Sequence, residues 1–145
     1  MYSNTNSTVN IITWNANGLS RKINELRDFV SEHSPELLFL QEHKLSPSSP
    51  ISIPNYCVYR SNRAIGANRQ RGGGTALLVK CCIPHYQVTI PQLSAIEATA
   101  ISIITNANIT YTFVSTNIPP RKLHATGESD LNSLLSLGTH VIIGG

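Results

Sequence analysis

Residues 9–43 read VNIITWNANGLSRKINELRDFVSEHSPELLFLQEH, and their pattern indicates a strand, a helix and a second strand. Val9 to Trp14 has the composition of a strand. Ser20 is the expected N-cap of a helix whose apolar residues repeat at helical spacing: Ile23, Leu26, Phe29 and Val30. Ser34-Pro35 ends that helix, and Leu37 to Leu40 is an unbroken apolar run typical of a buried strand. This order predicts parallel strands joined by a helical crossover, so the fold class is α/β.

The middle of the chain has a different pattern. Five β-type runs are separated by turn residues and not by helices: Cys57 to Arg60, Thr75 to Lys80, Gln87 to Ile90, Ile96 to Ile104 and Ile109 to Ser115. They predict antiparallel hairpins, with a tight turn at Asn106-Ala107-Asn108. Ser46 to Pro54, rich in serine and proline, predicts an irregular connection. A second helix over Ser129 to Leu137 and a final strand over His140 to Ile143 complete a mixed α/β pattern.

Composition limits the class of protein. The chain has 145 residues, 41% of them apolar, which fits one compact domain and excludes a disordered chain. A net charge of +3 neither identifies nor excludes a nucleic-acid partner. No signal sequence is evident and no apolar stretch reaches the roughly 18 residues of a membrane span, so we expect a soluble protein that is not exported. Cys57, Cys81 and Cys82 match no disulfide framework or zinc spacing, which predicts small buried side chains in a reducing compartment.

Polar or small residues follow four of the predicted strands. Asn15 and Asn17 follow the first, Glu42 the second, Asn117 a later one and Gly144-Gly145 the last. If the helices are crossovers, the carboxyl ends of these strands lie along one edge of the sheets, where α/β proteins place ligands. One carboxylate flanked by amides suits Mg²⁺ and a phosphate substrate. Taken singly, each Asn is equally typical of a turn, and Glu42 of a solvated loop.

Three segments occur in an order and at a spacing that together are specific. They are Ile12 to Leu19 (ITWNANGL), Leu40 to Leu45 (LQEHKL) and Arg71 to Leu77 (RGGGTAL). They resemble the first motif, the metal-carboxylate motif and the glycine-led strand of the endonuclease/exonuclease/phosphatase superfamily, more narrowly of the apurinic-endonuclease-like domain of non-LTR retrotransposons. The resemblance implies a four-layer αββα sandwich with mixed β-sheets and Mg²⁺-dependent phosphodiester hydrolysis. In those retrotransposons the implied task is nicking target DNA, so that a reverse transcriptase can prime from the cut.

The resemblance also implies roles for single residues. Glu42 is the implied ligand of Mg²⁺, or of Mn²⁺, with Asn15 orienting the metal or the phosphate. Asn17 is the implied neighbour of the scissile phosphate. Asn117 stands where the family commonly has Tyr before its prolines, so an amide replaces a phenolic hydroxyl there only in part.

The resemblance extends from Val9 to Gly145, where Val141 to Gly145 is similar to the strand that leads into the family's Gly-Asp-Phe-Asn motif. The general base, its Asn partner and a later Asp-His pair are not among the 145 residues. None of the five histidines is expected to replace them: His33, His43, His85, His124 and His140. We therefore expect residues 1–8 to be a flexible terminus and residues 9–145 to be the N-terminal part of such a domain, incomplete at its C-terminal end and inactive alone.

Basic residues beside the motifs are candidates for DNA contacts, although ordinary solvated loop charges are the simpler interpretation of them. They are Lys44, Arg69, Arg71 and Arg121, with Arg63 and Lys122 nearby. The glycines 72–74 precede a β run and match no nucleotide-binding fingerprint, which predicts close strand packing. Glu97 is expected to be an ordinary face residue, because nothing in its spacing connects it to Glu42.

Two alternatives to a DNA endonuclease remain open. One is a catalytically inactive remnant of a mobile element, or a nucleic-acid-binding fragment. The other keeps the superfamily and changes the substrate to a phosphoinositide or another phosphoester. The expected partners are DNA and a reverse transcriptase domain of the complete polyprotein, with no membrane. We expect a nuclear protein if it works in retrotransposition, and otherwise an intracellular one.

Overall fold

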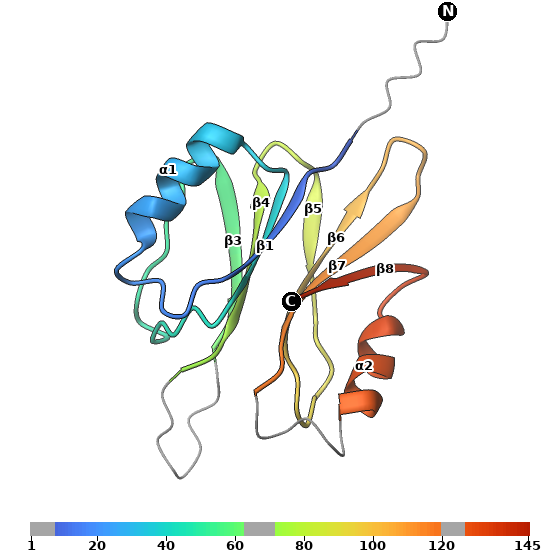
Figure 1. Cartoon of the computed structure of the whole chain (residues 1–145). Coiled ribbons are helices and arrows are strands. Elements are labelled where there is room, and N and C mark those ends of the chain that lie inside the picture. Colours follow the sequence, from blue (N-terminus) through green and yellow to red (C-terminus); the bar gives the residue numbers. More distant parts are fainter. Residues whose placement is uncertain (1–7, 63–71, 120–126) are drawn as a thin grey trace, which may run out of the picture.

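The computed structural model describes residues 8–62, 72–119 and 127–145, and Figure 1 shows their arrangement. In chain order the elements are β1 (Ile11–Asn15), α1 (Ile23–His33), β2 (Leu37–Gln41), β3 (Tyr56–Ser61), β4 (Thr75–Lys80), β5 (His85–Val88), β6 (Glu97–Ile104), β7 (Thr110–Asn117), α2 (Gly127–Leu135) and β8 (His140–Gly144). No helix within these ranges is long and apolar enough to cross a membrane.

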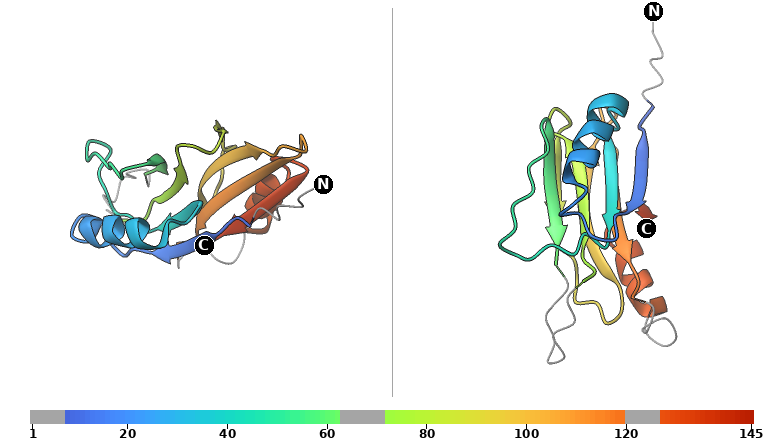
Figure 2. Two further views of the ribbon diagram at one scale, coloured as in Figure 1. Left: turned by 90° about the horizontal axis from the view of Figure 1, so that it is seen from above. Right: turned by 60° about the vertical axis from the view of Figure 1, so that its left-hand side comes forward.

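The strands form two four-stranded mixed sheets. The first has the order β1-β2-β4-β3, in which β1 and β2 are parallel and the other pairs are antiparallel. The second has the order β5-β6-β7-β8, in which β7 and β8 are the parallel pair. The helices α1 and α2 lie on opposite outer sides of the two sheets (Figures 1 and 2). The predicted four-layer αββα sandwich and both helical crossovers are confirmed.

Three apolar clusters hold the layers together. Leu26 and Val30 of α1 pack on Leu38 and Leu40 of β2, and Leu134 of α2 packs on the outer face of the second sheet. Between the sheets lies a third cluster of buried side chains: Leu37, Phe39, Leu77, Val79, Ile101 and Phe113. Because side chains alternate along a strand, the run 37–40 supplies both the cluster under α1 and the cluster between the sheets. This explains why the whole of β2 is buried.

The ends of α1 differ in how well they could be predicted. Ser34 has left-handed backbone angles and closes the helix just before Pro35, as expected. The N-cap is Lys22 and not Ser20, and no side chain caps that end. A turn precedes the helix instead, in which Lys22 donates its backbone N–H to the Leu19 carbonyl at 2.8 Å. The helix therefore begins two residues later than Ser20 would place it.

The observed β region differs from the expected one in strand bounds, in strand pairing and in the exposure of the cysteines. The strand β5 begins and ends two residues earlier than the predicted run Gln87 to Ile90. The strands β4 and β5 do not form a hairpin, since they belong to different sheets. The cysteines are not buried apolar residues: Cys81 and Cys82 are exposed and Cys57 is half-buried. Both exposed cysteines lie in the turn after β4, where the alternation of a strand no longer applies.

A buried carboxylate anchors α2 to the second sheet. Asp130 is 4% exposed and accepts hydrogen bonds at 2.6–3.0 Å from the backbone N–H groups of Ser94, Ala95 and Ile96. Several N–H donors of this kind compensate a carboxylate for its burial. The segment that Asp130 binds leads directly into β6, so this contact fixes where β6 begins.

Candidate active site

The loops after β1 and β2 are joined by backbone hydrogen bonds beyond the last strand pair. The N–H of Ala16 donates to the Gln41 carbonyl at 2.9 Å, that of Gly18 to Glu42 at 2.8 Å, and that of Leu19 to His43 at 3.0 Å. The parallel pairing Asn15 with Gln41 thus continues through both loops. It brings the segments of Asn15, Asn17 and Glu42 side by side at one edge of the first sheet.

Three residues of these two loops adopt left-handed backbone angles. The φ angles are 43° at Asn17, 51° at Glu42 and 54° at Lys44. For residues other than glycine such angles are uncommon, and they persist where the surrounding structure holds them. At Glu42 the turn ends β2, so the strand does not continue to His43.

The polar side chains of the two loops contact one another. Asn15 Oδ1 accepts the backbone N–H of Asn17 at 3.1 Å. Lys44 Nζ donates to Asn17 Oδ1 at 2.5 Å and lies 3.8 Å from Glu42 Oε2. The Glu42 side chain is 29% exposed and that of Lys44 is 42% exposed, so both are accessible from solvent. The structure thus gathers Asn15, Asn17 and Glu42, as the sequence predicts, and adds the ammonium of Lys44.

The glycine loop before β4 lies against the second of these loops. Lys44 donates its backbone N–H to the Gly73 carbonyl at 2.9 Å. A Cβ added at Gly74, where φ is +83°, would lie 2.4 Å from His43 Nε2 and 2.9 Å from the Ser61 carbonyl oxygen. The predicted close packing is therefore confirmed at Gly74, where the neighbours are a side chain and the end of a strand.

His43 has a structural role in this arrangement. It is 1% exposed, its Nδ1 accepts the backbone N–H of Leu45 at 3.0 Å, and its Nε2 donates to the Ser61 carbonyl at 2.9 Å. These two bonds define the neutral tautomer. Burial lowers the pKa of His43, which also favours the neutral ring. The side chain therefore connects the Glu42 loop to the end of β3.

Asn117 belongs to the second sheet and reaches the glycine loop through Glu97, which the sequence analysis expected to be an ordinary face residue. Glu97 Oε2 accepts the Asn117 side-chain amide at 2.9 Å and the backbone N–H of Gly74 at 2.9 Å. Glu97 is therefore not an ordinary face residue, because it joins the two sheets at the site. The predicted turn around Ala107 could have indicated that Glu97 lies beside Asn117. The two residues are equally far from Ala107, and they pair across the hairpin.

The donor set fits a hard divalent cation. The available ligands are the carboxylate oxygens of Glu42 and the amide oxygen of Asn15, and Mg²⁺ commonly takes one or two carboxylates and keeps several waters. A cationic group, the Lys44 ammonium, already lies against the oxygens of Glu42 and Asn17. Within residues 8–62, 72–119 and 127–145, no group of three or more His, Cys, Asp or Glu side chains could hold a metal. A cation held by the oxygens of Glu42 and Asn15 would take its other oxygens from water or phosphate.

The predicted DNA-binding residues divide into two groups. Lys44 lies at the site, beside Glu42 and Asn17. The others fall outside the described residues: Arg69, Arg71 and Arg121, together with Arg63 and Lys122. Lys44 is thus the predicted basic residue that can be placed relative to Glu42.

Comparisons with known proteins identify the family and the fold. Residues 12–145 match the model of the Endonuclease/Exonuclease/phosphatase family. The RNA-directed DNA polymerase from mobile element jockey of Drosophila melanogaster is 28% identical over 142 residues, which cover 97% of this chain and 15% of that protein. The chain thus spans a small part of this relative.

Two solved structures share the fold. The endonuclease domain of TRAS1, a telomere-specific non-LTR retrotransposon, matches with a TM-score of 0.63 and 18% identity, over 94% of this chain and 59% of that one. The Xenopus laevis APE2 catalytic domain matches with a TM-score of 0.64 and 19% identity, over 93% and 57% of the two chains. With the family model matched from the first strand to the last, this chain belongs to the Endonuclease/Exonuclease/phosphatase family.

Proposed function

We propose that this chain supplies the metal-binding part of a site that hydrolyses phosphodiester bonds in DNA, in an endonuclease that nicks target DNA for retrotransposition. The observation that carries the proposal is the joining of the β1 and β2 loops, which puts the Glu42 carboxylate, the Asn15 and Asn17 amides and the Lys44 ammonium at one sheet edge. Family membership and the retrotransposon relatives support the choice of DNA as substrate.

The residues have distinct roles in this proposal. Glu42 and Asn15 hold Mg²⁺, or Mn²⁺, which when bound stabilises negative charge on phosphate oxygens. Asn17 donates its amide N–H groups to a non-bridging oxygen of the scissile phosphate. Lys44 contributes a positive charge that attracts the DNA backbone. Asn117, oriented by Glu97, is an amide donor on the opposite side of the site.

We assign the activity to a longer protein rather than to these residues alone. The chain covers 59% of the TRAS1 endonuclease domain and 15% of the jockey polymerase. In this proposal residues 9–145 are one part of the endonuclease domain, and a reverse transcriptase domain is the partner in the same polypeptide. Retrotransposition requires access to chromosomal DNA, so the proposed site of action is the nucleus.

The test separates metal binding from cleavage. We expect Mn²⁺, added to the 145-residue chain, to broaden the amide NMR signals of residues 15–18 and 41–44, because a paramagnetic ion relaxes nearby nuclei. The substitution Glu42→Gln removes the charged ligand and should abolish the broadening, whereas Glu128→Gln, on exposed α2, should leave it unchanged. Broadening that is centred elsewhere, or that survives in Glu42→Gln, would contradict the assignment of the metal site.

Cleavage is measured on the longer protein with supercoiled plasmid DNA. We expect Mg²⁺-dependent conversion to the nicked circle, and a loss of at least about 10²-fold in rate for Glu42→Gln, the scale on which removing one catalytic group acts. The matched control is Glu36→Gln, at the far end of β2. DNA binding without metal-dependent nicking would favour the inactive-remnant alternative instead.

A further inference from the structure

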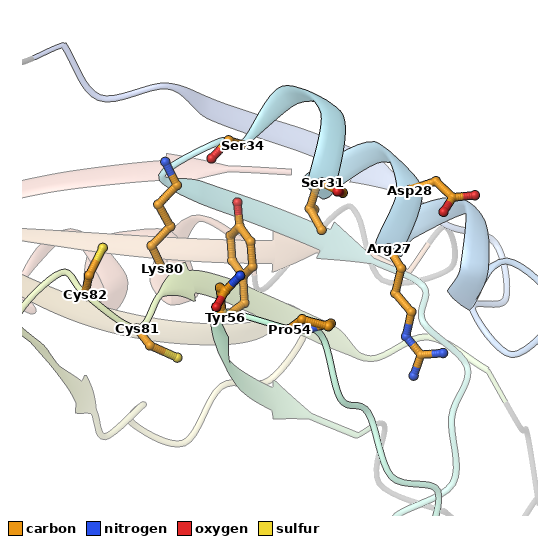
Figure 3. A pocket seen from close by; sticks show the side chains of 11 residues that line it. Arg27, Asp28, Ser31, Ser34, Pro54, Tyr56, Lys80, Cys81 and Cys82 are labelled. Carbon is orange, nitrogen blue, oxygen red and sulfur yellow. The ribbon is translucent and has the colours of Figure 1, made fainter.

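Three cysteines gather at the end of the first sheet that is remote from the candidate active site. Cys57 lies near the start of β3, and Cys81 and Cys82 follow the end of β4. Cys81 and Cys82 line a cavity of about 800 Å³ that also borders α1 (Figure 3). Because these two side chains are exposed, solvent and small solutes reach their sulfur atoms directly.

Cys57 and Cys81 form the close pair among the three. Their sulfur atoms lie 2.9 Å apart, which leaves less than about 1 Å to the length of a disulfide bond. Hydrogen-bonded backbone holds both residues, since Cys57 pairs with Val79 in the β3–β4 ladder and the Cys81 N–H donates to the Asn55 carbonyl at 2.9 Å. Cys82 points away from Cys81 (Figure 3), so the adjacent residues in sequence are not the facing pair.

We propose that Cys57 and Cys81 are an oxidisable dithiol, which a peroxide converts into a disulfide across β3 and the end of β4. Cys81 is exposed and reacts first. Its sulfur attacks one peroxide oxygen, the O–O bond breaks, water leaves and a sulfenic acid forms. The Cys57 sulfur then attacks the Cys81 sulfur, the S–O bond breaks and a second water leaves with the Cys57 proton. The peroxide takes two electrons and the two thiols supply them.

The exposure of the two thiols distinguishes their roles. The hydrogen bond with Cys81 raises the pKa of Cys57, so Cys57 keeps its proton more firmly than an ordinary thiol. Cys81 is assigned as the first nucleophile because it is exposed to the peroxide, whereas Cys57 is half-buried and follows as the resolving thiol. The resulting disulfide closes the chain between residues 57 and 81, which includes the glycine loop of the candidate active site.

The test is oxidation of the full 145-residue chain with one equivalent of hydrogen peroxide, followed by alkylation and peptide mass mapping. We expect the intact mass to fall by that of two hydrogen atoms, a crosslinked peptide pair containing Cys57 and Cys81, and Cys82 recovered in alkylated form. Cys82→Ser is the matched control and should give the same crosslink. In Cys57→Ser the crosslink should be absent, with Cys81 recovered as a sulfenic acid or an intermolecular disulfide.

A second measurement keeps the proposal independent of how each variant folds. We expect the midpoint of thermal unfolding of the native sequence to rise by about 5–10 °C on oxidation, because the crosslink restricts the unfolded chain, and to return on reduction with dithiothreitol. A crosslink between Cys81 and Cys82 would overturn the proposal. So would dimers through Cys82 in place of an internal bond, or oxidation of each thiol to a sulfinic acid without any crosslink.

Discussion

The layer between the two sheets is apolar at one end and polar at the other. Along the face of β2 that meets the second sheet, Leu37 and Phe39 are followed by Gln41. The same change from apolar to polar side chains occurs in three other strands of the layer, always toward the candidate active site. In β4 the apolar Val79 and Leu77 give way to Thr75. In β6 Ile101 gives way to Thr99 and Glu97, and in β7 Phe113 gives way to Ser115 and Asn117. The two ends therefore hold the sheets together by different means.

At the polar end, hydrogen bonds replace apolar contact. Gln41 Nε2 donates to Ser115 Oγ at 3.3 Å, the hydroxyls of Thr75 and Thr99 lie 2.8 Å apart, and Glu97 joins Gly74 to Asn117. Hydrogen bonds contribute less net stability than apolar burial, but they are directional. The apolar end therefore mainly stabilises the sandwich, while the polar end fixes the relative position of groups from both sheets.

The apolar end should give the largest loss of stability. Phe39 is 1% exposed, and a Cβ added at Gly144 would lie 2.5 Å from its ring, so β8 packs directly on it. We expect Phe39→Ala to lower the free energy of unfolding by about 3–5 kcal/mol, through lost burial and the cavity left behind. Urea denaturation followed by circular dichroism measures it. Leu135→Ala, at a residue that is 48% exposed, is the control, and equal losses in both variants would refute this view of the layer.

The second largest loss of stability should come from Gly74, the tightest backbone position at the polar end. We expect Gly74→Ala to cost about 2–3 kcal/mol, because the backbone there has φ of +83° and the new Cβ would collide with His43 and the Ser61 carbonyl. Gly127→Ala is the matched control, since among the described residues outside its own helix turn no atom lies within 4 Å of a Cβ at that position. Chemical denaturation of both variants gives the comparison. If Gly74→Ala were as stable as Gly127→Ala, the glycine loop would not need this close approach.

The apolar end could be read from the sequence better than the polar end. The run Leu37 to Leu40 and the β4 strand Thr75–Lys80 were predictable because a buried strand requires an unbroken apolar pattern. The Ser20 cap was wrong, since local capping preference yielded to a turn that the neighbouring loop fixes through Leu19. The exposure of Cys81 was missed because composition does not reveal where a strand ends.

In the candidate active site, the sequence could predict which residues lie at one edge but not which contact joins the two sheets. Strand order sufficed to predict that Asn15, Asn17 and Glu42 lie at one edge, because parallel strands end together. The role of Glu97 depends on the approach of Gly74 from the other sheet, a contact between segments 23 residues apart that no local pattern encodes. The hairpin register alone would have paired Glu97 with Asn117, but not with Gly74.

The contact across the polar end should give a smaller and more specific effect. Both donors bind the same oxygen, Glu97 Oε2, and a glutamine replaces this charged acceptor with a neutral amide oxygen, so we expect Glu97→Gln to cost about 1–2 kcal/mol. The backbone amide signal of Gly74 and the side-chain amide signals of Asn117 should shift together. Combining the substitution with Asn117→Ala should give less than the sum of the single effects. Additive effects would mean that Glu97 does not couple the two sheets.

The smallest effect on stability is expected from an ion pair at the apolar end. The pH dependence of the free energy of unfolding measures it. Glu36 Oε1 accepts a hydrogen bond from Lys80 Nζ at 2.9 Å, and the Asn10 backbone N–H donates to Glu36 Oε2. These two donors, Lys80 more than Asn10, hold the pKa of Glu36 below its usual range. Unfolding therefore takes up a proton as the pH falls below about 4.3, so the stabilisation is complete above that pH and is lost in acid.

We expect about 1 kcal/mol of the stability at pH 6 to depend on this carboxylate, a value typical of a partly exposed charged hydrogen bond. Urea denaturation between pH 3 and pH 6 should show a flatter dependence for Glu36→Gln than for the native sequence. Glu32→Gln, whose side chain is 79% exposed in the native chain, should keep the native slope. An unchanged slope in Glu36→Gln would mean that the pair adds nothing to the apolar packing beside it. Stability at the apolar end would then come from the packing around Phe39. The two ends would differ more clearly, one held by apolar contact and the other by hydrogen bonds.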